Sequence, residues 1–313
     1  MNALITGSNG LLGHHLTEMK NMTFIGLSKG ENTNPNIMDG DYINYNMTIK
    51  GSLFYLLNKY EWVDVFIHCA AYTNVDKAES DAQALKELNV DATKELCDVA
   101  VKMKKKLIYI STDYVFDGVT GNYSEKSKPN PINAYGKSKL EAEEYILKTH
   151  LNSLVIRTST PYTYKSHKKV DFARWVYNEL RDGKQIKVVT DQISNPTYLP
   201  HLADAIYSLM GSNLKGIAHI AGDLPISRYN FAKAIAKEAG FDPNLIIPVT
   251  TADLDQAANR PLNSSLDTSS WQNVNPQKWH LPMHEGFNQF IKKMKTEERK
   301  MTRAATRHSK AKK

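Results

Sequence analysis

Residues 2–13 read NALITGSNGLLG, and this stretch decides the fold. The apolar start predicts a buried strand, and the pattern over residues 11–20 predicts a helix. At the turn between them, Gly7 permits a sharp bend, Gly10 lets the backbone approach a phosphate, and Gly13 lets the helix pack closely on the strand. The helix N-terminus attracts a pyrophosphate. The turn therefore predicts a dinucleotide site, whose residues are Gly7, Asn9, Gly10, Leu11, Leu12 and Gly13.

Apolar runs alternate with amphipathic stretches through the first half of the chain. The further predicted strands cover residues 23–27, 63–69, 106–111 and 153–157, and the further predicted helices cover 82–103 and 137–149. Strands that are apolar throughout and alternate with helices indicate a parallel sheet covered on both faces. We therefore expect an α/β fold, namely a Rossmann-type doubly wound parallel sheet.

The rhythm loosens after Thr160, where prolines separate shorter elements. This change predicts a smaller, irregular α/β C-terminal lobe for the substrate. The predicted units are an NADP-binding Rossmann domain at 1–160 with parts of 190–222, a substrate lobe at 161–189 and 223–291, and a basic, disordered tail at 292–313.

Composition limits the class of protein. The chain has 313 residues, of which 41% are hydrophobic and 23% charged, as in ordinary globular proteins. It contains no apolar run long enough to span a membrane, and its first residues do not resemble a secretory signal. Two cysteines cannot form a disulfide framework. We therefore expect a cytoplasmic protein with no membrane partner.

The net charge of +7 is concentrated at the C-terminus. Residues 292–313 contain ten basic and two acidic side chains, a net +8, so the remainder of the chain carries about −1. Such a segment is typical of a solvated tail. We expect residues 296–313 to be dispensable for folding and catalysis. Nucleic-acid binding is a possibility for this tail alone and is not the expected function of the protein.

The end of the second predicted strand indicates which dinucleotide binds. NAD sites commonly place Asp or Glu there, for the ribose 2′-hydroxyl. This chain has Ser28 and Lys29, a hydroxyl and a cation suited to a 2′-phosphate. Glu31 is a nearby contrary signal, and Lys29 as an ordinary surface lysine is the alternative. We predict NADPH as the cofactor, with NADH possible.

Tyr135 and Lys139 are four residues apart at a predicted helix start and therefore share a face. A nearby ammonium lowers the pKa of a phenol, which makes tyrosine a workable acid–base group. Thr112 ends a buried strand, where the ligand crevice of a parallel sheet opens. Its hydroxyl could donate a hydrogen bond to the same substrate carbonyl oxygen that Tyr135 would contact. The alternatives are a surface pair for Tyr135 and Lys139, and strand-end capping for Thr112.

Taken together, these segments resemble the extended short-chain dehydrogenase/reductases. The matching segments are GSNGLLG, CAAYTNVDKAES, ISTDYVFDG, NAYGKSK, RTS, DQISNPT and the late RPLNS, which begins at Arg260. Within that superfamily the chain most resembles the dTDP-4-dehydrorhamnose reductase family, over about residues 1–290. The resemblance implies that Thr112, Tyr135 and Lys139 are catalytic.

The resemblance also implies further contacts. Asn46 and Met47 would contact the adenine, although the family usually has Asp at the first position. The residues expected along the cofactor's ribose and nicotinamide are Cys69, Ala70, Ala71, Tyr72, Tyr135 and Lys139. Those expected to face the nucleotide sugar are Thr73, Val75, Thr112, Asp113, Tyr135 and Arg260.

Two departures from the family pattern affect these expectations. The family reads RTSW where residues 157–160 of this chain read RTST, so an aromatic wall of the sugar pocket is missing and the resemblance does not imply which sugar is the substrate. Some members bind magnesium at a dimer interface through glutamates near the third glycine. This chain has His14 and His15 there, so we expect no metal and read both as ordinary helix residues.

Two functions from different classes follow. The first is NADPH-dependent reduction of the C4 keto group of a 4-keto-6-deoxy nucleotide sugar, an oxidoreductase reaction of dTDP-rhamnose biosynthesis. The second is a non-catalytic dinucleotide-binding subunit, because the segments GLLG and LNVDA also resemble the regulatory beta subunit of methionine adenosyltransferase. A homodimer is possible in either case.

Overall fold

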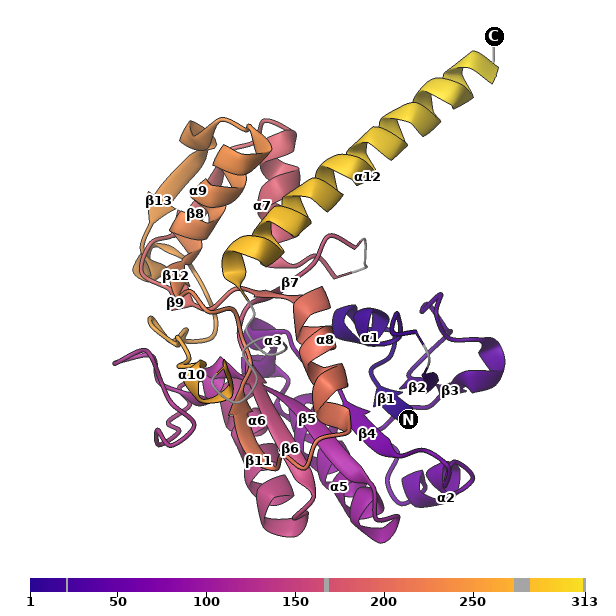
Figure 1. The fold of residues 1–313 in the computed structure, drawn as a ribbon. Coiled ribbons are helices and arrows are strands. Elements are labelled where there is room, and N and C mark those ends of the chain that lie inside the picture. Colours follow the sequence, from indigo (N-terminus) through magenta and orange to yellow (C-terminus); the bar gives the residue numbers. More distant parts are fainter. Residues whose placement is uncertain (21, 166–168, 273–281, 312–313) are drawn as a thin grey trace.

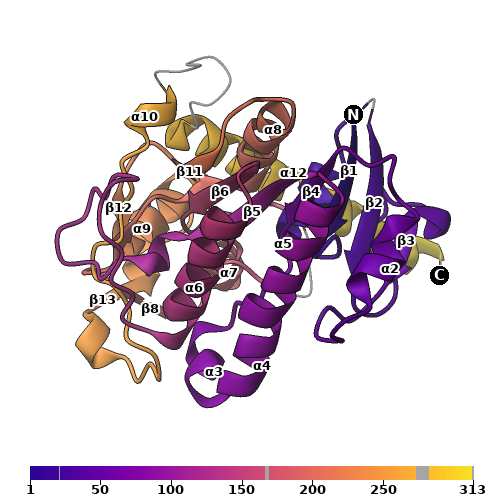
Figure 2. The ribbon, with the colours of Figure 1, turned by 90° about the horizontal axis from the view of Figure 1, so that it is seen from below.

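The computed structural model describes residues 1–20, 22–165, 169–272 and 282–311. Its main sheet has seven parallel strands in the order β11-β6-β5-β4-β1-β2-β3 (Figures 1 and 2). Their bounds are β1 Asn2–Thr6, β2 Thr23–Ser28, β3 Tyr42–Asn44, β4 Val65–His68, β5 Lys106–Thr112, β6 Ser153–Thr158 and β11 Gly216–His219. The predicted Rossmann-type α/β fold is confirmed.

Helices cover both faces of this sheet. Helix α1 (Leu11–Leu16) and helix α8 (Leu199–Met210) pack on one face, where Leu16 and Ile206 join the core formed with β1, β4 and β6. Five more helices belong to this domain, namely α2 Leu53–Asn58, α3 Val75–Ser80, α4 Ala82–Lys86, α5 Ala92–Lys102 and α6 Ala134–Thr149. Of these, α2, α5 and α6 pack on the opposite face of the sheet and form a second hydrophobic core with it. Because α8 and β11 follow elements of the second lobe, the chain returns to the sheet late.

Some elements differ from the sequence-based expectation. Helix α1 ends at Leu16 rather than near Lys20, and its C-cap Thr17 donates to the Gly13 carbonyl from both its amide and its hydroxyl. The long helix expected over residues 82–103 is interrupted by a π-helical turn at Glu87–Asp91. Helix α6 begins earlier than expected, because Asn133 caps it by accepting from the Gly136 amide at 2.8 Å. The sequence analysis did not identify β3 or α2.

The second lobe contains three two-stranded sheets, which pair β7 with β10, β8 with β13 and β9 with β12. Its elements are β7 Pro161–Tyr162, α7 Phe172–Arg181, β8 Ile186–Val189, β9 Ile193–Ser194, β10 Thr197–Tyr198, β12 Ile226–Ser227, α9 Arg228–Ala239, β13 Ile246–Val249, α10 Ser269–Gln272 and α12 Met283–Ala311. Aromatic rings fill its core: the Tyr162 ring lies 5.4 Å from Phe231 and 5.5 Å from Phe290.

Helix α12 corrects the expectation that a disordered tail begins at residue 292. The helix runs to Ala311, and Figure 1 shows its C-terminal half extending away from the second lobe. Phe290, Ile291 and Met294 are buried in the second-lobe core, so their helical spacing fixes this part of the chain. Residues 312 and 313 lie outside the described residues.

Among the residues that the structure describes, no helix combines the length and the apolar character needed to cross a membrane. Cys69 is half-buried, Cys97 is buried, and both are free thiols.

Candidate active site

The glycine turn leaves no room for side chains. Gly7 has φ +69°, and a Cβ there would lie 2.7 Å from the Ala70 amide nitrogen. A Cβ on Gly13 would lie 2.6 Å from the carbonyl oxygen of Ser8. Gly10 caps α1 in an extended conformation, with its amide bonded to the Gly7 carbonyl at 2.8 Å. The backbone at the start of α1 is therefore bare, as a cradle for a pyrophosphate requires.

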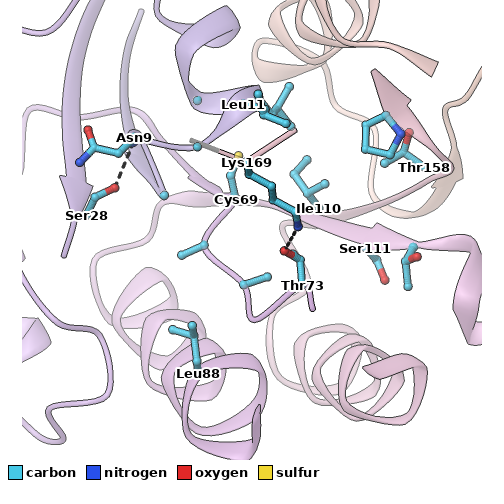
Figure 3. Close-up of a pocket in the computed structure, with 18 of the residues that line it drawn as sticks. Asn9, Leu11, Ser28, Cys69, Thr73, Leu88, Ile110, Ser111, Thr158 and Lys169 are labelled. Carbon is cyan, nitrogen blue, oxygen red and sulfur yellow. Dashed lines mark hydrogen bonds between the residues drawn. The ribbon is translucent and has the colours of Figure 1, made fainter. Parts of the chain in front are cut away.

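A cavity of about 480 Å³ opens at the carboxyl ends of β1, β2, β4, β5 and β6 (Figure 3). It brings together most of the residues proposed for the cofactor and the reaction. Those in its wall are Gly7, Asn9, Gly10, Leu11, Leu12, Gly13, Ser28, Lys29, Asn46, Met47, Cys69, Ala70, Ala71, Thr73, Thr112, Asp113, Tyr135 and Lys139. Segments separated by more than a hundred residues thus share one cavity.

Ser28 and Lys29 have different surroundings in this wall. The buried Ser28 hydroxyl accepts a hydrogen bond of 3.1 Å from the Asn9 amide and lies 3.2 Å from the Ser8 hydroxyl (Figure 3). Lys29 is exposed and lines the cavity. Glu31, the contrary signal, is outside the lining, and its carbonyl accepts from the Asn9 side chain at 2.8 Å. Lys29 is thus an exposed cation in the cavity wall, next to the buried Ser28 hydroxyl.

Thr112 and Tyr135 meet where β5 ends and α6 begins. Thr112 is the last residue of β5, and its hydroxyl is hydrogen-bonded to the Tyr135 phenol. The Thr112 hydroxyl also donates to Asp113 at 3.1 Å and accepts from the Tyr114 amide at 3.2 Å. Strand-end capping, the alternative reading of Thr112, is therefore present together with the contact to Tyr135.

Lys139 lies one helical turn after Tyr135 and is buried. Its ammonium donates a hydrogen bond of 2.7 Å to the Ile110 carbonyl and lies 4.0 Å from the centre of the Tyr109 ring. Burial lowers the pKa of Lys139 to about 7. The surface-pair alternative does not hold, because Lys139 is buried and Tyr135 is only partly exposed, in the wall of the cavity.

The expected lowering of the Tyr135 pKa by Lys139 is not found. Burial raises the pKa of Tyr135 above its usual value near 10, and the hydrogen bond between the Tyr135 and Thr112 hydroxyls opposes that rise only in part. The physical reason is that Lys139 directs its ammonium to the Ile110 carbonyl, so desolvation dominates the phenol. In this structure Tyr135 is therefore a protonated phenol at neutral pH.

Asp113 joins three segments behind the cavity wall. Its buried carboxylate accepts from Ser159 at 2.8 Å and from Ser264 at 2.5 Å, in addition to Thr112. Burial raises the pKa of Asp113. The RTS and RPLNS segments recognised in the sequence are thus held to the end of β5 by one side chain.

A second cavity, also about 480 Å³, adjoins the first, and Thr73 and Lys169 line both. It contains the remaining predicted substrate residues, Val75 and Arg260. Arg260 forms an ion pair of 2.7 Å with Asp76, in the first turn of α3. Four basic and three aromatic side chains lie in the wall, namely Lys169, Lys187, Arg228, Arg260, Tyr114, Phe172 and Trp175.

Several of these residues were not predicted. Lys169 lies between β7 and α7 and donates a hydrogen bond to the Thr73 hydroxyl (Figure 3). Arg228 begins α9, and its guanidinium lies 4.8 Å from the centre of the Phe172 ring. No local pattern marks these positions, because they meet the sheet-end residues only after the second lobe folds back.

Tyr72 is the predicted cofactor residue that lines neither cavity. Its amide donates to the Asn89 side chain at 2.7 Å, and its hydroxyl donates to Asp81 at 3.2 Å. These bonds turn the ring toward α4, whereas the preceding residues Ala70 and Ala71 remain in the cavity wall.

The two departures from the family pattern have clear structural positions. Thr160 lines the first cavity with φ +42°, and its hydroxyl lies 2.7 Å from that of Ser194. His15 is buried, with Nδ1 3.0 Å from Glu18 and Nε2 2.7 Å from Thr163. His15 thus connects α1 to the second lobe, a role that the reading as an ordinary helix residue missed.

Known proteins resemble the chain over almost its whole length. The family model described as RmlD substrate binding domain matches residues 1–295. A dTDP-4-dehydrorhamnose reductase of Aggregatibacter actinomycetemcomitans is 31% identical over 291 residues, covering 88% of this chain and 95% of that protein. The methionine adenosyltransferase 2 subunit beta of Bos taurus is 29% identical over 279 residues, covering 85% and 80%.

A solved structure agrees with these matches. The dTDP-4-dehydrorhamnose reductase of Bacillus anthracis, determined in complex with NADP, is 30% identical and has a TM-score of 0.81 to this chain. The match covers 93% of this chain and 98% of that one. The family model, the identity and the shared structure confirm the resemblance carried by the sequence motifs: this chain belongs to the dTDP-4-dehydrorhamnose reductase family.

Proposed function

We propose that the protein is an NADPH-dependent reductase of the C4 keto group of a 4-keto-6-deoxy nucleotide sugar. One observation carries this proposal. The hydrogen-bonded hydroxyls of Thr112 and Tyr135 lie in the same cavity as the bare glycine turn, next to the buried Lys139. A dinucleotide cradle and a proton donor are therefore within reach of one substrate carbonyl.

The residues present fit a dinucleotide. The cradle at Gly7, Gly10 and Gly13 would hold the pyrophosphate, because any Cβ on Gly7 or Gly13 would collide with backbone. Lys29 would meet the 2′-phosphate, and Asn46 and Met47 would flank the adenine. The small residues Cys69, Ala70 and Ala71 leave room for the nicotinamide side. The NADP complex of the Bacillus anthracis relative supports this choice of cofactor.

When bound, NADPH supplies the hydride that reduces the carbonyl carbon. Tyr135 supplies the proton to the carbonyl oxygen, since its raised pKa keeps the phenol protonated at neutral pH. The Thr112 hydroxyl orients the same oxygen. Lys139 would bind the ribose of the cofactor; its ammonium, which bonds the Ile110 carbonyl, does not lower the pKa of Tyr135.

The second cavity would hold the nucleotide part of the substrate. Its wall combines cations that suit a diphosphate with aromatic rings that suit a base. Thr73 and Val75 would face the sugar between the two cavities, and Arg260, held by Asp76, would face the nucleotide. Thr160 leaves the sugar pocket wider than a tryptophan would. We therefore expect this chain to select its sugar through polar contacts rather than through an aromatic wall.

The direct test is NADPH oxidation by the purified protein with dTDP-4-dehydrorhamnose and, separately, its UDP counterpart. We expect turnover with at least one of them, followed at the nicotinamide absorbance, and no oxidation with dTDP or UDP alone. Tight NADPH binding without reduction of either sugar would contradict the proposal.

A regulatory subunit is the second candidate, and the identity to the Bos taurus beta subunit favours it. A protein of that kind would bind NADPH and a methionine adenosyltransferase but reduce neither sugar. The oxidation assay therefore separates the two functions. The cytoplasmic location and a homodimer remain predictions for either.

A further inference from the structure

We propose that Glu143, paired with Arg157, is a positioning residue that aligns Thr112 and Lys139 for reduction. The inference rests on the proposed function, in which Thr112 contacts the substrate and Lys139 the cofactor. Neither Glu143 nor Arg157 lines the two cavities described above, so any effect must pass through their neighbours.

Glu143 connects three elements behind the active site. Its carboxylate accepts from the Arg157 Nε at 3.1 Å on each oxygen and from Nη2 at 2.6 Å. It also accepts a hydrogen bond from the Ser111 hydroxyl. Both members of the ion pair have side chains only 1% exposed. Helix α6, strand β5 and strand β6 are therefore held together by one buried carboxylate.

The connected positions are those next to the reactive groups. Ser111 immediately precedes Thr112 on β5, so holding Ser111 fixes the end of that strand. Lys139 lies one turn before Glu143 on α6, and its ammonium bonds the Ile110 carbonyl of the same strand. A movement of Glu143 would therefore shift Thr112 relative to Lys139.

Glu143 also acts on Lys139 through its charge. Burial lowers the pKa of Lys139 to about 7, and Glu143 is the strongest opposing influence. The other groups around the ammonium are Cys69 and His68 at the end of β4 and the Tyr109 ring on β5. Burial lowers the pKa of His68 and raises that of Cys69, so both are neutral at pH 7. Glu143 is thus the carboxylate that favours the protonated form of Lys139.

Stability is a poor explanation for such a pair. The desolvation of two buried charges costs about as much as their attraction returns, so apolar replacements are often neutral. The arrangement is instead explained by the direction of the carboxylate toward the strand and the helix that supply the reactive groups.

The test compares NADPH affinity as a function of pH in the full-length protein. Glu143→Gln removes the charge, so Lys139 loses its proton at lower pH. We expect the loss of NADPH affinity on raising the pH to shift to lower pH by about one unit. Glu144→Gln is the matched control, because Glu144 is the exposed neighbour on the same helix. We expect its profile to coincide with that of the wild type.

A second variant separates positioning from folding. Glu143→Gln combined with Arg157→Gln leaves no unpaired buried charge, and its thermal unfolding shows whether it folds. We expect the same shifted profile and a kcat at least about tenfold lower, with KM for the sugar nearly unchanged. A folded double variant with wild-type profile and kcat would overturn the inference. Arg157→Lys, which keeps the charge without the two-pronged contact, should lower kcat without shifting the profile.

The proposed function and this inference fail in different ways. A wild-type protein that does not bind NADPH contradicts the proposed function. A wild type that binds NADPH, together with a Glu143→Gln profile equal to that of Glu144→Gln, contradicts only the role of Glu143.

Discussion

The hydroxyl of Tyr177 donates a hydrogen bond of 3.0 Å to the carboxylate of Glu298, which joins α7 to α12. The Tyr177 side chain is fully buried, so this acceptor is not readily replaced by water. Residues beyond 295 lie outside the matching family model, yet one of them accepts a hydrogen bond from a core side chain of the second lobe.

This contact revises the expectation for the tail. Deletion of residues 301–313 should leave the melting temperature unchanged. Deletion of 296–313 removes Glu298 and should lower the free energy of unfolding by about 1–3 kcal/mol, because the Tyr177 hydroxyl loses its acceptor. Urea unfolding measures both. Glu298→Ala should reproduce the loss and Glu297→Ala should not, and equal stability of both deletions would contradict this assignment.

Replacing Tyr135 by Phe should lower kcat by about 10²–10⁴, because the ring packing remains and the proton donor is lost. NADPH affinity should stay near the wild-type value, since the glycine cradle and Lys139 are unchanged. Steady-state kinetics and a fluorescence titration give the two numbers. Normal turnover with Phe at position 135 would refute the mechanism.

Lys29→Asp should move cofactor preference from NADPH toward NADH. The exchange places a negative charge beside the 2′-phosphate, and we expect NADPH affinity to fall by about tenfold or more. Titration of both cofactors tests this, with Lys20→Asp as a control on an exposed lysine outside the cavity. Ser28→Ala should instead affect mainly the turn, because its hydroxyl accepts from Asn9. An unchanged preference in Lys29→Asp would mean that another group binds the phosphate.

Gly13→Ala should weaken NADPH binding and destabilise the first lobe. The new methyl group would lie 2.6 Å from the Ser8 carbonyl oxygen, so backbone must shift at a cost of about 1–3 kcal/mol. Gly40→Ala is the matched control, because a Cβ there meets nothing within 4 Å. Thermal unfolding without NADPH measures the loss of stability in each variant, and the increase in melting temperature on adding NADPH measures cofactor binding. Equal melting temperatures would show that the close packing at Gly13 is relieved without cost.

His68 makes stability depend on pH. It is buried, with Nδ1 2.6 Å from the Thr6 hydroxyl and Nε2 2.8 Å from that of Thr93. Burial lowers the pKa of His68 to about 3, whereas the unfolded chain binds the proton near its ordinary value of 6.5. The free energy of unfolding should therefore fall as pH drops from 6.5 toward 3, by at most about 1.4 kcal/mol per unit for this group.

The measurement is urea unfolding at neutral and acid pH for His68→Gln and for His284→Gln, whose ring is exposed. We expect His68→Gln to lose part of the acid sensitivity and His284→Gln to retain all of it. An identical pH dependence in both variants would remove His68 from the explanation.

The sequence by itself determined most of the first lobe and most of the residues that line its cavity. Glycines at 7, 10 and 13 permit one kind of turn, and apolar strands alternating with helices permit few topologies, so local rules suffice there. The spacing of Tyr135 and Lys139 likewise places both on one helix face whatever surrounds them.

Only the tertiary structure decided the electrostatics and the second lobe. The direction of the Tyr135 pKa depends on how deeply the phenol is buried, which no spacing encodes. Lys169, Arg228 and Glu298 meet their partners only when distant segments pack together. Helix α12 shows the same principle: its charged sequence indicated a solvated tail, but the burial of Phe290 and Met294 against the second lobe holds it as a helix.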